Sequence, residues 1–370
     1  MIKIMTVFGT RPEAIKMAPL VAALQEAQDV ECILCVTAQH RSMLDQVLEL
    51  FSLVPKYDLD IMKPNQTIST ITSNVLLGMD EVIEKEKPDM ILVHGDTSTT
   101  FATALSSFYH QIPVGHVEAG LRTYNKYSPF PEEINRILTG HIADLHFAPT
   151  LLNKENLIKE GIPQENIIVT GNTVIDALLQ VAGKPYKFED KILSKLDFEN
   201  KRIITVTCHR RENLGEYMDN IFGAVARIAQ EFSDVEIVYP VHLNPKVEES
   251  AKRNLEGIKN IHLIEPLTYQ PFVNLMAKSY FILTDSGGMQ EEAPALGKPV
   301  LVVRRETERP EAILAGTVKL AGIEEDTIYA MAKELLTNKT IYEEMAKATN
   351  PYGDGNACSK IVEALKKFLE

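Results

Sequence analysis

The glycine-containing segment 284–297, between the apolar runs 280–283 and 298–303, has the most distinctive residue types of the chain. The run 280–283 is typical of a buried strand, and the segment 285–288 requires a sharp turn before a short helix near Met289. Backbone N–H groups, the Ser286 hydroxyl and the helix N-terminus then face one point, which suits a phosphate or a diphosphate. The alternative is an ordinary strand-to-helix turn whose glycines permit tight packing. Glu291 and Glu292 suit ribose hydroxyl groups better than phosphate.

Carboxylates follow two apolar runs in the first half of the chain. Asp96 comes just after the run 90–93, and Glu118 comes directly after the run 114–117. A carboxylate at the end of a buried strand is rarely needed for packing, so both are candidates for acid–base chemistry. Asp96 has the alternative role of capping the helix that begins near Thr99.

Two adjacent glutamates open a helix after the rigid segment 129–131. Glu132 and Glu133 both stabilise a helix start through its dipole. That structural role explains one of the two better than it explains both, so this helix start is a further candidate site.

Cationic residues stand at three other predicted strand ends or helix starts. In the segment 9–13, Thr10 and Glu13 form a capping box, and Arg11 and Lys16 add positive charge. His209 follows the strand-like run 203–207 together with two arginines, which indicates an anion site or an acid–base histidine. The alternative for His209 is a histidine that is satisfied within its own turn. Arg309 precedes another helix start.

Several catalytic signatures are absent from the sequence. It has no Walker A pattern, no dinucleotide fingerprint after a strand, no H-E-x-x-H or cysteine cluster for zinc, and no G-x-S-x-G elbow. We therefore expect neither a metal nor a cofactor. Cys32 and Cys35 lie three apart in a strand-like run, so they face opposite sides and are expected in the core.

Composition bounds the class of protein. The formal net charge is −13 and no basic stripe is visible, which argues against a nucleic-acid partner. We expect no signal peptide, because an apolar, strand-like run follows Met1 directly, and no run approaches the roughly 18 apolar residues of a membrane span. Four scattered cysteines favour a reduced, cytoplasmic protein without a membrane partner.

Apolar runs alternate with helix-like periodicity almost throughout, which predicts an α/β protein with parallel sheets covered on both faces. A length of 370 residues favours two domains. We expect a first Rossmann-like, doubly wound domain over residues 1–170 and a second over residues 171–355, with a linker region at 183–200. The two domains are expected to face each other across a cleft, with ligands at the carboxyl ends of the strands. The last helix, in 356–370, is expected to pack back on the first domain.

Taken together, these residues resemble those of the bacterial non-hydrolysing UDP-N-acetylglucosamine 2-epimerases. The resemblance covers nearly the whole chain, in order, through the segments FGTRPEAIK at 8–16, HGDT at 94–97, HVEAGLRT at 116–123, PFPEEINR at 129–136, HRREN at 209–213, TDSGGMQEEAP at 284–294, ERPE at 308–311 and NPYGDG at 350–355. It implies a GT-B-type fold and interconversion of UDP-GlcNAc and UDP-ManNAc for cell-wall or capsular polysaccharide, in a homodimer.

The resemblance also implies roles for individual residues. The implied catalytic residues are Asp96, Glu118, Glu132 and His209. The implied UDP contacts are Arg11, Lys16, Phe272, Ser286, Gly287, Gly288, Glu292 and Arg309, with Glu292 as the ribose ligand. The implied contacts of a second, allosteric UDP-GlcNAc are Gln39, Gln66, Arg210 and His242.

The chemistry of the reaction narrows the mechanism independently. Inverting C2 of a sugar requires removal of its hydrogen, although no carbonyl group neighbours it. Transient oxidation needs a nicotinamide, and the missing dinucleotide fingerprint counts against that route. The other route eliminates UDP to an unsaturated sugar and adds UDP back, which needs acid–base groups and an anion site. The alternatives are a GT-B glycosyltransferase with a UDP-sugar donor, a hydrolysing epimerase that releases ManNAc, and a nucleotide-sugar sensor without turnover.

Overall fold

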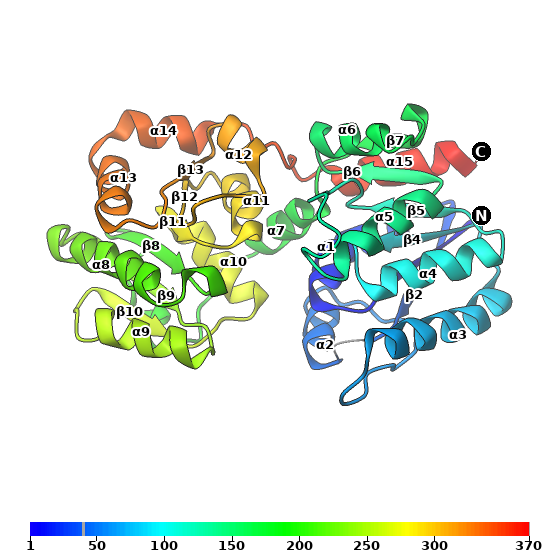
Figure 1. Cartoon of the computed structure of the whole chain (residues 1–370), viewed down its shortest axis with the longest axis horizontal. Coiled ribbons are helices and arrows are strands. Elements are labelled where there is room, and N and C mark those ends of the chain that lie inside the picture. The colour runs from blue at the N-terminus through cyan, green and yellow to red at the C-terminus, as the bar shows by residue number, and fades with distance from the viewer. Residues whose placement is uncertain (39–40, 370) are drawn as a thin grey trace. The chain divides into compact units, whose positions relative to one another are not determined.

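The computed structural model describes residues 1–38 and 41–369, which form two compact units. Figure 1 shows both units with most of their helices and strands labelled. The first unit comprises Met1–Ala177 together with the chain from Tyr352 onward, and the second comprises Leu178–Pro351. The division falls at 177/178 and 351/352, whereas the sequence placed it at 170/171 and 355/356. Each unit is described by itself.

In the described part of the first unit, a seven-stranded parallel sheet has the order β3-β2-β1-β4-β5-β6-β7. The strands are β1 (Ile2–Phe8), β2 (Val30–Val36), β3 (Tyr57–Asp58), β4 (Met90–His94), β5 (Val114–Val117), β6 (Leu145–Ala148) and β7 (Ile167–Val169). The helices are α1 (Arg11–Glu26), α2 (Arg41–Leu50), α3 (Ile68–Glu86), α4 (Ser98–Tyr109), α5 (Glu132–Ile142), α6 (Leu151–Lys159) and α15 (Ala357–Leu369), and α7 (Thr173–Ala182) begins in this unit and continues past the division at 177/178.

In the second unit, a six-stranded parallel sheet has the order β10-β9-β8-β11-β12-β13 within the part of the chain that the structure describes. Its strands are β8 (Arg202–Thr207), β9 (Val235–Pro240), β10 (Ile261–Ile264), β11 (Phe281–Thr284), β12 (Val300–Val302) and β13 (Val318–Leu320). Its helices are α8 (Glu216–Glu231), α9 (Pro245–Leu255), α10 (Tyr269–Lys278), α11 (Gly287–Ala295), α12 (Pro310–Leu314), α13 (Glu325–Thr337) and α14 (Lys339–Lys347).

The strand order reverses once in each sheet, and this reversal positions the candidate residues. In the first sheet, β1 lies beside β4, so the turn after β1 meets the loop that carries Asp96. In the second sheet, β8 lies beside β11, so the segment after β8 meets the segment 285–288. Ligands of open parallel sheets bind at such switch points, because the loops diverge there.

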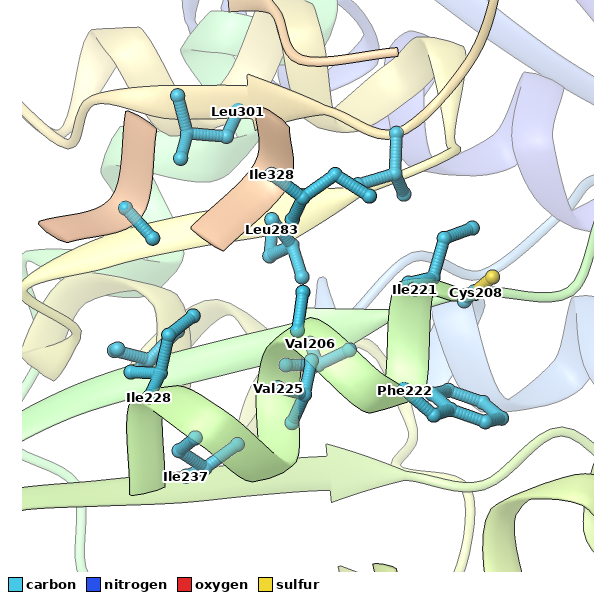
Figure 2. Packing of buried hydrophobic residues seen from close by; sticks show 14 of the residues in the cluster. Val206, Cys208, Ile221, Phe222, Val225, Ile228, Ile237, Leu283, Leu301 and Ile328 are labelled. Atoms are coloured by element: carbon cyan, nitrogen blue, oxygen red, sulfur yellow. The ribbon is translucent and has the colours of Figure 1, made fainter. Parts of the chain in front are cut away.

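The cores explain why these runs form strands and helices. Central strands such as β4, β5 and β6 are buried along their whole length, as expected when helices cover both faces of a sheet. In the second unit, the apolar face of α8 packs on the sheet through Ile221, Val225 and Ile228, as Figure 2 shows. The α/β prediction with doubly wound parallel sheets is confirmed.

The prediction of a linker at 183–200 is wrong for most of that segment. Phe188 and Leu193 are buried in a cluster with Ile203 and Val238 of the second sheet. The Phe188 and Phe198 rings stack with centroids 5.3 Å apart. Apolar side chains spaced along a charged segment therefore fold it onto the second unit.

Two further details concern the ends of helices. Helix α11 begins at Gly287 with Ser286 as its N-cap, and not near Met289 as the sequence indicated. At the end of the chain, α15 packs against α1, and the Asp176 carboxylate on α7 accepts hydrogen bonds from the N–H groups of Ala357 (3.3 Å) and Cys358 (2.9 Å). A buried side chain thus caps the returning helix. None of the helices in the described residues is long and apolar enough to cross a membrane.

Candidate active site

Glu13 ties two loops of the first sheet together. One of its carboxylate oxygens accepts hydrogen bonds from the N–H groups of Gly9 (3.1 Å) and Thr10 (2.8 Å), and the other accepts from the hydroxyls of Thr97 (2.8 Å) and Thr100 (3.1 Å). Burial raises the pKa of Glu13, and the hydrogen bonds oppose that rise. The predicted capping box is present, and it also fixes the start of α4 beside the start of α1.

Glu118 is the centre of a buried charge network at the end of β5. Its Oε1 lies 2.5 Å from Lys16 Nζ and accepts a hydrogen bond from Asn172 Nδ2 at 2.8 Å, and its Oε2 lies 3.3 Å from His94 Nε2. Its φ of +61° is the left-handed conformation, which costs energy for any residue other than glycine and is typical of functional sites. The backbone conformation at Glu118 therefore determines the direction in which this carboxylate points.

The neighbours of Glu118 determine its charge. Burial by itself raises the pKa of Glu118, but the Lys16 ammonium, the His94 ring and the hydrogen bonds from Lys16 and Asn172 together hold it below its usual range. Burial lowers the pKa of His94 to about 4 in spite of the Glu118 carboxylate. At pH 7 the network therefore contains an ionised carboxylate, a lysine ammonium and a neutral imidazole.

Asp96 lies beyond the end of β4 and forms a second ion pair. Its Oδ2 accepts a hydrogen bond from Arg136 Nη2 at 2.5 Å, and its backbone carbonyl accepts one from Asn135 Nδ2 at 3.0 Å. Burial raises the pKa of Asp96, whereas Arg136 opposes that rise and Glu118 adds to it. Because Thr97 caps α4, the capping role that the sequence allowed for Asp96 belongs to its neighbour.

The structure separates the two adjacent glutamates of α5. Glu133 is fully buried, accepts hydrogen bonds from the N–H groups of Thr123 and Tyr124, and pairs with Arg136 at 3.2 Å. It is therefore a structural residue that holds the loop after Glu118. Glu132 is partly exposed, and its carboxylate makes no hydrogen bond or ion pair among the residues that the structure describes. Glu132 keeps its place as a candidate.

In the second unit, two guanidinium groups converge on the start of α11. A Cβ atom added at Gly287 would lie 3.8 Å from Arg210 Nη2 and 4.0 Å from Arg309 Nη2. Ser286 is the N-cap, yet its side chain makes no capping hydrogen bond. Backbone N–H groups, a hydroxyl and two cations thus meet where a helix dipole already attracts an anion.

Two carboxylates on α11 lie beside this anion site, which we call the cradle (Ser286, Gly287, Gly288, Arg210 and Arg309). Glu291 is buried and pairs with the guanidinium of Arg309, which fixes the direction of that side chain. Glu292 is also buried, and its Oε1 would lie 3.3 Å from a Cβ atom added at Gly288, so its side chain reaches back toward the N-terminus of the helix. Because the helix begins at Gly287, neither glutamate is in its first turn.

His209 follows β8 and lies close to the same segment. Its Nδ1 is 3.5 Å from Asp285 Oδ1, and its ring stacks on the His242 ring with centroids 5.2 Å apart and an interplanar angle of 9°. Burial lowers the pKa of His209, the Asp285 carboxylate opposes this, and His242 and Arg210 reinforce it. The structure does not show a histidine satisfied within its own turn, because the carboxylate next to its ring is that of Asp285, which follows the neighbouring strand β11.

The other candidates that the resemblance implied are Arg11, Phe272, Gln66 and Gln39. Arg11 is the first residue of α1 and, in the described residues, makes no hydrogen bond or ion pair. Phe272 is half-buried on α10. The Gln66 amide closes its own loop, since Oε1 accepts from Lys63 N at 2.8 Å and Nε2 donates to the Ile61 carbonyl at 2.7 Å. Gln39 lies outside the described residues.

Several residues of the site were not singled out from the sequence. His94, Arg136, Asn172 and Asp285 each contact a candidate residue, and three of them lie inside motifs that the sequence displayed. For His94 and Asp285 a signal was therefore present, namely a polar residue within or just after a buried strand, whereas Arg136 lies inside α5. The partner of each was hidden, because the pairs are as far as 76 positions apart for Asp285 and His209.

Comparison with known proteins decides the family. The family model described as UDP-N-acetylglucosamine 2-epimerase matches residues 22–366. The chain belongs to the UDP-N-acetylglucosamine 2-epimerase family. It is 59% identical over 364 residues to the UDP-N-acetylglucosamine 2-epimerase of Bacillus subtilis strain 168, covering 98% of this chain and 95% of that protein.

Solved structures agree with this assignment. A crystal structure of a UDP-N-acetylglucosamine 2-epimerase from Listeria monocytogenes, described as putative, matches with a TM-score of 0.94 at 54% identity, over 99% of this chain and 96% of that one. The UDP-GlcNAc 2-epimerase from Neisseria meningitidis, solved bound to UDP-GlcNAc, matches with a TM-score of 0.86 at 52% identity, over 99% and 100% of the two chains. The expected family, GT-B-type fold and enzyme class, a non-hydrolysing 2-epimerase, are confirmed.

Proposed function

We propose that this enzyme interconverts UDP-GlcNAc and UDP-ManNAc by eliminating UDP and adding it back. One observation carries the mechanism: Asp96 and Glu118, at neighbouring strand ends, have pKa values moved in opposite directions. When two neighbouring groups have pKa values shifted in opposite directions, one of them can transfer a proton while the other stays ionised and stabilises charge. The related enzyme from Neisseria meningitidis is bound to UDP-GlcNAc, which supports this substrate.

In the proposed reaction, a base removes the C2 proton while the C1–O bond breaks and UDP departs with the bonding electrons. The product is a 2-acetamidoglucal. UDP then attacks C1 again, and C2 receives a proton on the opposite face. Asp96 is the better base because its pKa is raised, and Glu118 remains ionised beside Lys16. Glu132, without a partner in the described residues, is proposed as the second proton-transfer group.

UDP is proposed to remain bound through the elimination. The diphosphate is placed at Ser286, Gly287 and Gly288, with Arg309 and His209 facing the developing negative charge. Glu292 is proposed as the ribose ligand, and Phe272 as a contact of the uridine. Arg11 and Lys16 are proposed to add positive charge from the start of α1. Retention of UDP makes C1–O cleavage reversible.

Reaction in D2O tests the mechanism. With UDP-GlcNAc as substrate and no added nicotinamide, NMR should show deuterium at C2 of both UDP-GlcNAc and UDP-ManNAc. Product that carries only hydrogen at C2 would reject the elimination. Free ManNAc with UDP would indicate a hydrolysing enzyme, and UDP release that depends on an added acceptor would indicate a glycosyltransferase.

Replacement of Arg309 tests the cradle. We expect Arg309→Ala to weaken UDP binding by about 10- to 100-fold, since a hydrogen bond to a charged group contributes roughly 1.5–3 kcal/mol. Calorimetric titration of UDP measures this. Arg227→Ala in the same unit is the control, because Arg227 forms ion pairs with the surface residues Glu325 and Asp326 and lies over the Tyr329 ring, and none of these residues belongs to the proposed UDP site. Equal affinities of both variants and the wild type would remove Arg309 from the site.

Other aspects of the function rest on the resemblance to the family. We propose a cytoplasmic homodimer that supplies cell-wall or capsular polysaccharide synthesis and has a second, activating UDP-GlcNAc site near Arg210 and His242. The stacking of His242 on His209 offers a physical link between such a site and the reaction. Exposed Phe108 and Tyr109 at the end of α4 are apolar surface suited to a dimer contact.

A further inference from the structure

Asp285 is a fully buried carboxylate that links the two central strands of the second sheet. It follows β11, and its N–H donates to the carbonyl of Thr207 at the end of β8, 3.1 Å away. Burying a carboxylate costs free energy unless it is well paired, so its surroundings decide what the charge is for.

One oxygen of this carboxylate has a complete set of donors. Asp285 Oδ2 accepts hydrogen bonds from the N–H groups of His209 (2.8 Å) and Arg210 (2.7 Å) and from Asn213 Nδ2 (3.1 Å). These three bonds hold the segment after β8 in place. A neutral asparagine has an oxygen that accepts the same three bonds, so they do not by themselves require a negative charge.

The other oxygen faces the His209 ring. Asp285 Oδ1 accepts no well-aligned hydrogen bond in the described residues, and His209 Nδ1 lies 3.5 Å from it. The Cys208 thiol lies nearby, and burial together with Asp285 keeps the pKa of that thiol well above its usual range, so it stays protonated. The ring is held from its face as well, because it stacks on His242. Asp285 therefore meets one edge of a ring that is already restrained.

We propose that Asp285 is a positioning residue that fixes the orientation and tautomer of His209. Neutral His209 donates its Nδ1–H to Asp285 Oδ1 and carries a lone pair on Nε2. The charged ring carries an additional proton on Nε2, and this Nε2–H donates a hydrogen bond to the UDP diphosphate. One proton is gained or lost at Nε2, and Asp285 stays ionised throughout. The role of this proton in catalysis rests on the proposed elimination mechanism.

The tautomer is measured directly in the wild-type enzyme. Two-dimensional ¹H–¹⁵N NMR of uniformly labelled full-length protein distinguishes a protonated Nδ1 from a protonated Nε2, and the spectrum of His209→Asn assigns the signal. At pH 8 we expect the Nδ1–H tautomer. The Nε2–H tautomer in the wild type would overturn the proposal, and this measurement requires no folded Asp285 variant.

Asp285→Asn tests the same point in reverse. The asparagine oxygen keeps the three bonds to the 209–213 segment, but its amide group donates toward Nδ1 and thereby moves the ring proton to Nε2. We expect the Nε2–H tautomer and a fall in kcat on the order of 100-fold or more, with UDP affinity within about 3-fold of wild type, as for a positioned acid–base group. The pH midpoint for His209 should move lower, because the opposing carboxylate is lost. An unchanged tautomer with normal kcat would contradict the proposal.

Asn213→Ser is the matched control. It removes one donor to Asp285 Oδ2 but leaves the Oδ1–Nδ1 contact, so the tautomer and the pH midpoint of His209 should not change. If Asn213→Ser shifted the tautomer as Asp285→Asn does, the effect would be general loosening of the segment, and the proposal would be rejected. A wild type with the Nδ1–H tautomer but no deuterium exchange at C2 would instead reject the elimination mechanism and leave the Asp285–His209 pair intact.

Discussion

Asp96→Asn should lower kcat about 10²- to 10⁴-fold, the usual contribution of a positioned acid–base group. The asparagine oxygen still accepts the hydrogen bond from Arg136, so the loop after β4 should keep its shape. What is lost is a carboxylate whose pKa burial has raised and which therefore accepts a proton more readily than an exposed aspartate. Turnover by NMR and UDP affinity by calorimetry measure the two effects separately.

The expected pattern is a loss of turnover with UDP affinity within about 3-fold of wild type, as for an interaction made in the transition state. Asp80→Asn is the control, because Asp80 is a half-exposed acid of α3 that accepts a hydrogen bond from Ser106 at 2.8 Å. It should leave turnover unchanged. Normal turnover of Asp96→Asn would exclude Asp96 as a proton-transfer group, whereas loss of UDP binding would indicate a structural role.

Acid should destabilise the first unit through its buried histidines. His146 on β6 is fully buried, pairs in register with His116 on β5, and has its pKa lowered by burial to about 4. Burial also lowers the pKa of His116 to about 3 and that of His94 to about 4. An unfolded histidine binds a proton below about pH 6.5. The unfolded state therefore binds more protons than the folded state between about pH 6.5 and 4, and stability falls as the pH falls through that window.

The size of this effect follows from the two pKa values of His146. Between pH 7 and pH 5, the unfolded state gains roughly 2 kcal/mol from protonating this one residue, while the folded residue stays neutral. Buried carboxyls with raised pKa values, such as Glu13 and Asp176, act in the opposite direction, because their folded forms hold protons more tightly. The total slope is therefore a sum of opposing contributions, and a single-residue comparison isolates one of them.

His146→Gln makes that comparison. Its stability deficit relative to wild type should shrink by roughly 2 kcal/mol between pH 7 and pH 5, because glutamine does not titrate. Denaturant unfolding at both pH values measures the deficit. The exposed Leu138→Gln on α5 is the control, because neither residue titrates, and its difference from wild type should be the same at both pH values. A deficit of His146→Gln that does not change with pH would show that His146 does not set the acid limit.

Much of the fold was predictable because its signals are local. The strand-like runs 90–93, 114–117 and 203–207 match β4, β5 and β8 to within one residue at either end, since each is a short apolar run bounded by a turn or a polar residue. The segment 183–200 was misjudged because its charges suggest exposure, although apolar side chains spaced along it pack on the second sheet. The start of α11 was placed late because glycine is a poor helix former, whereas here the helix begins at a glycine after the N-cap Ser286.

The sequence by itself determined that Asp96, Glu118, His209 and the segment 285–288 stand at the ends of buried parallel strands. Such positions follow from the period of the apolar pattern and from the chain direction, which are local properties. Only the tertiary structure decided which charges are paired. Lys16 reaches Glu118 across 102 positions, and Asp285 reaches His209 across the contact between β11 and β8. It also separated Glu132 from Glu133, because pairing and burial depend on neighbours that are distant along the chain.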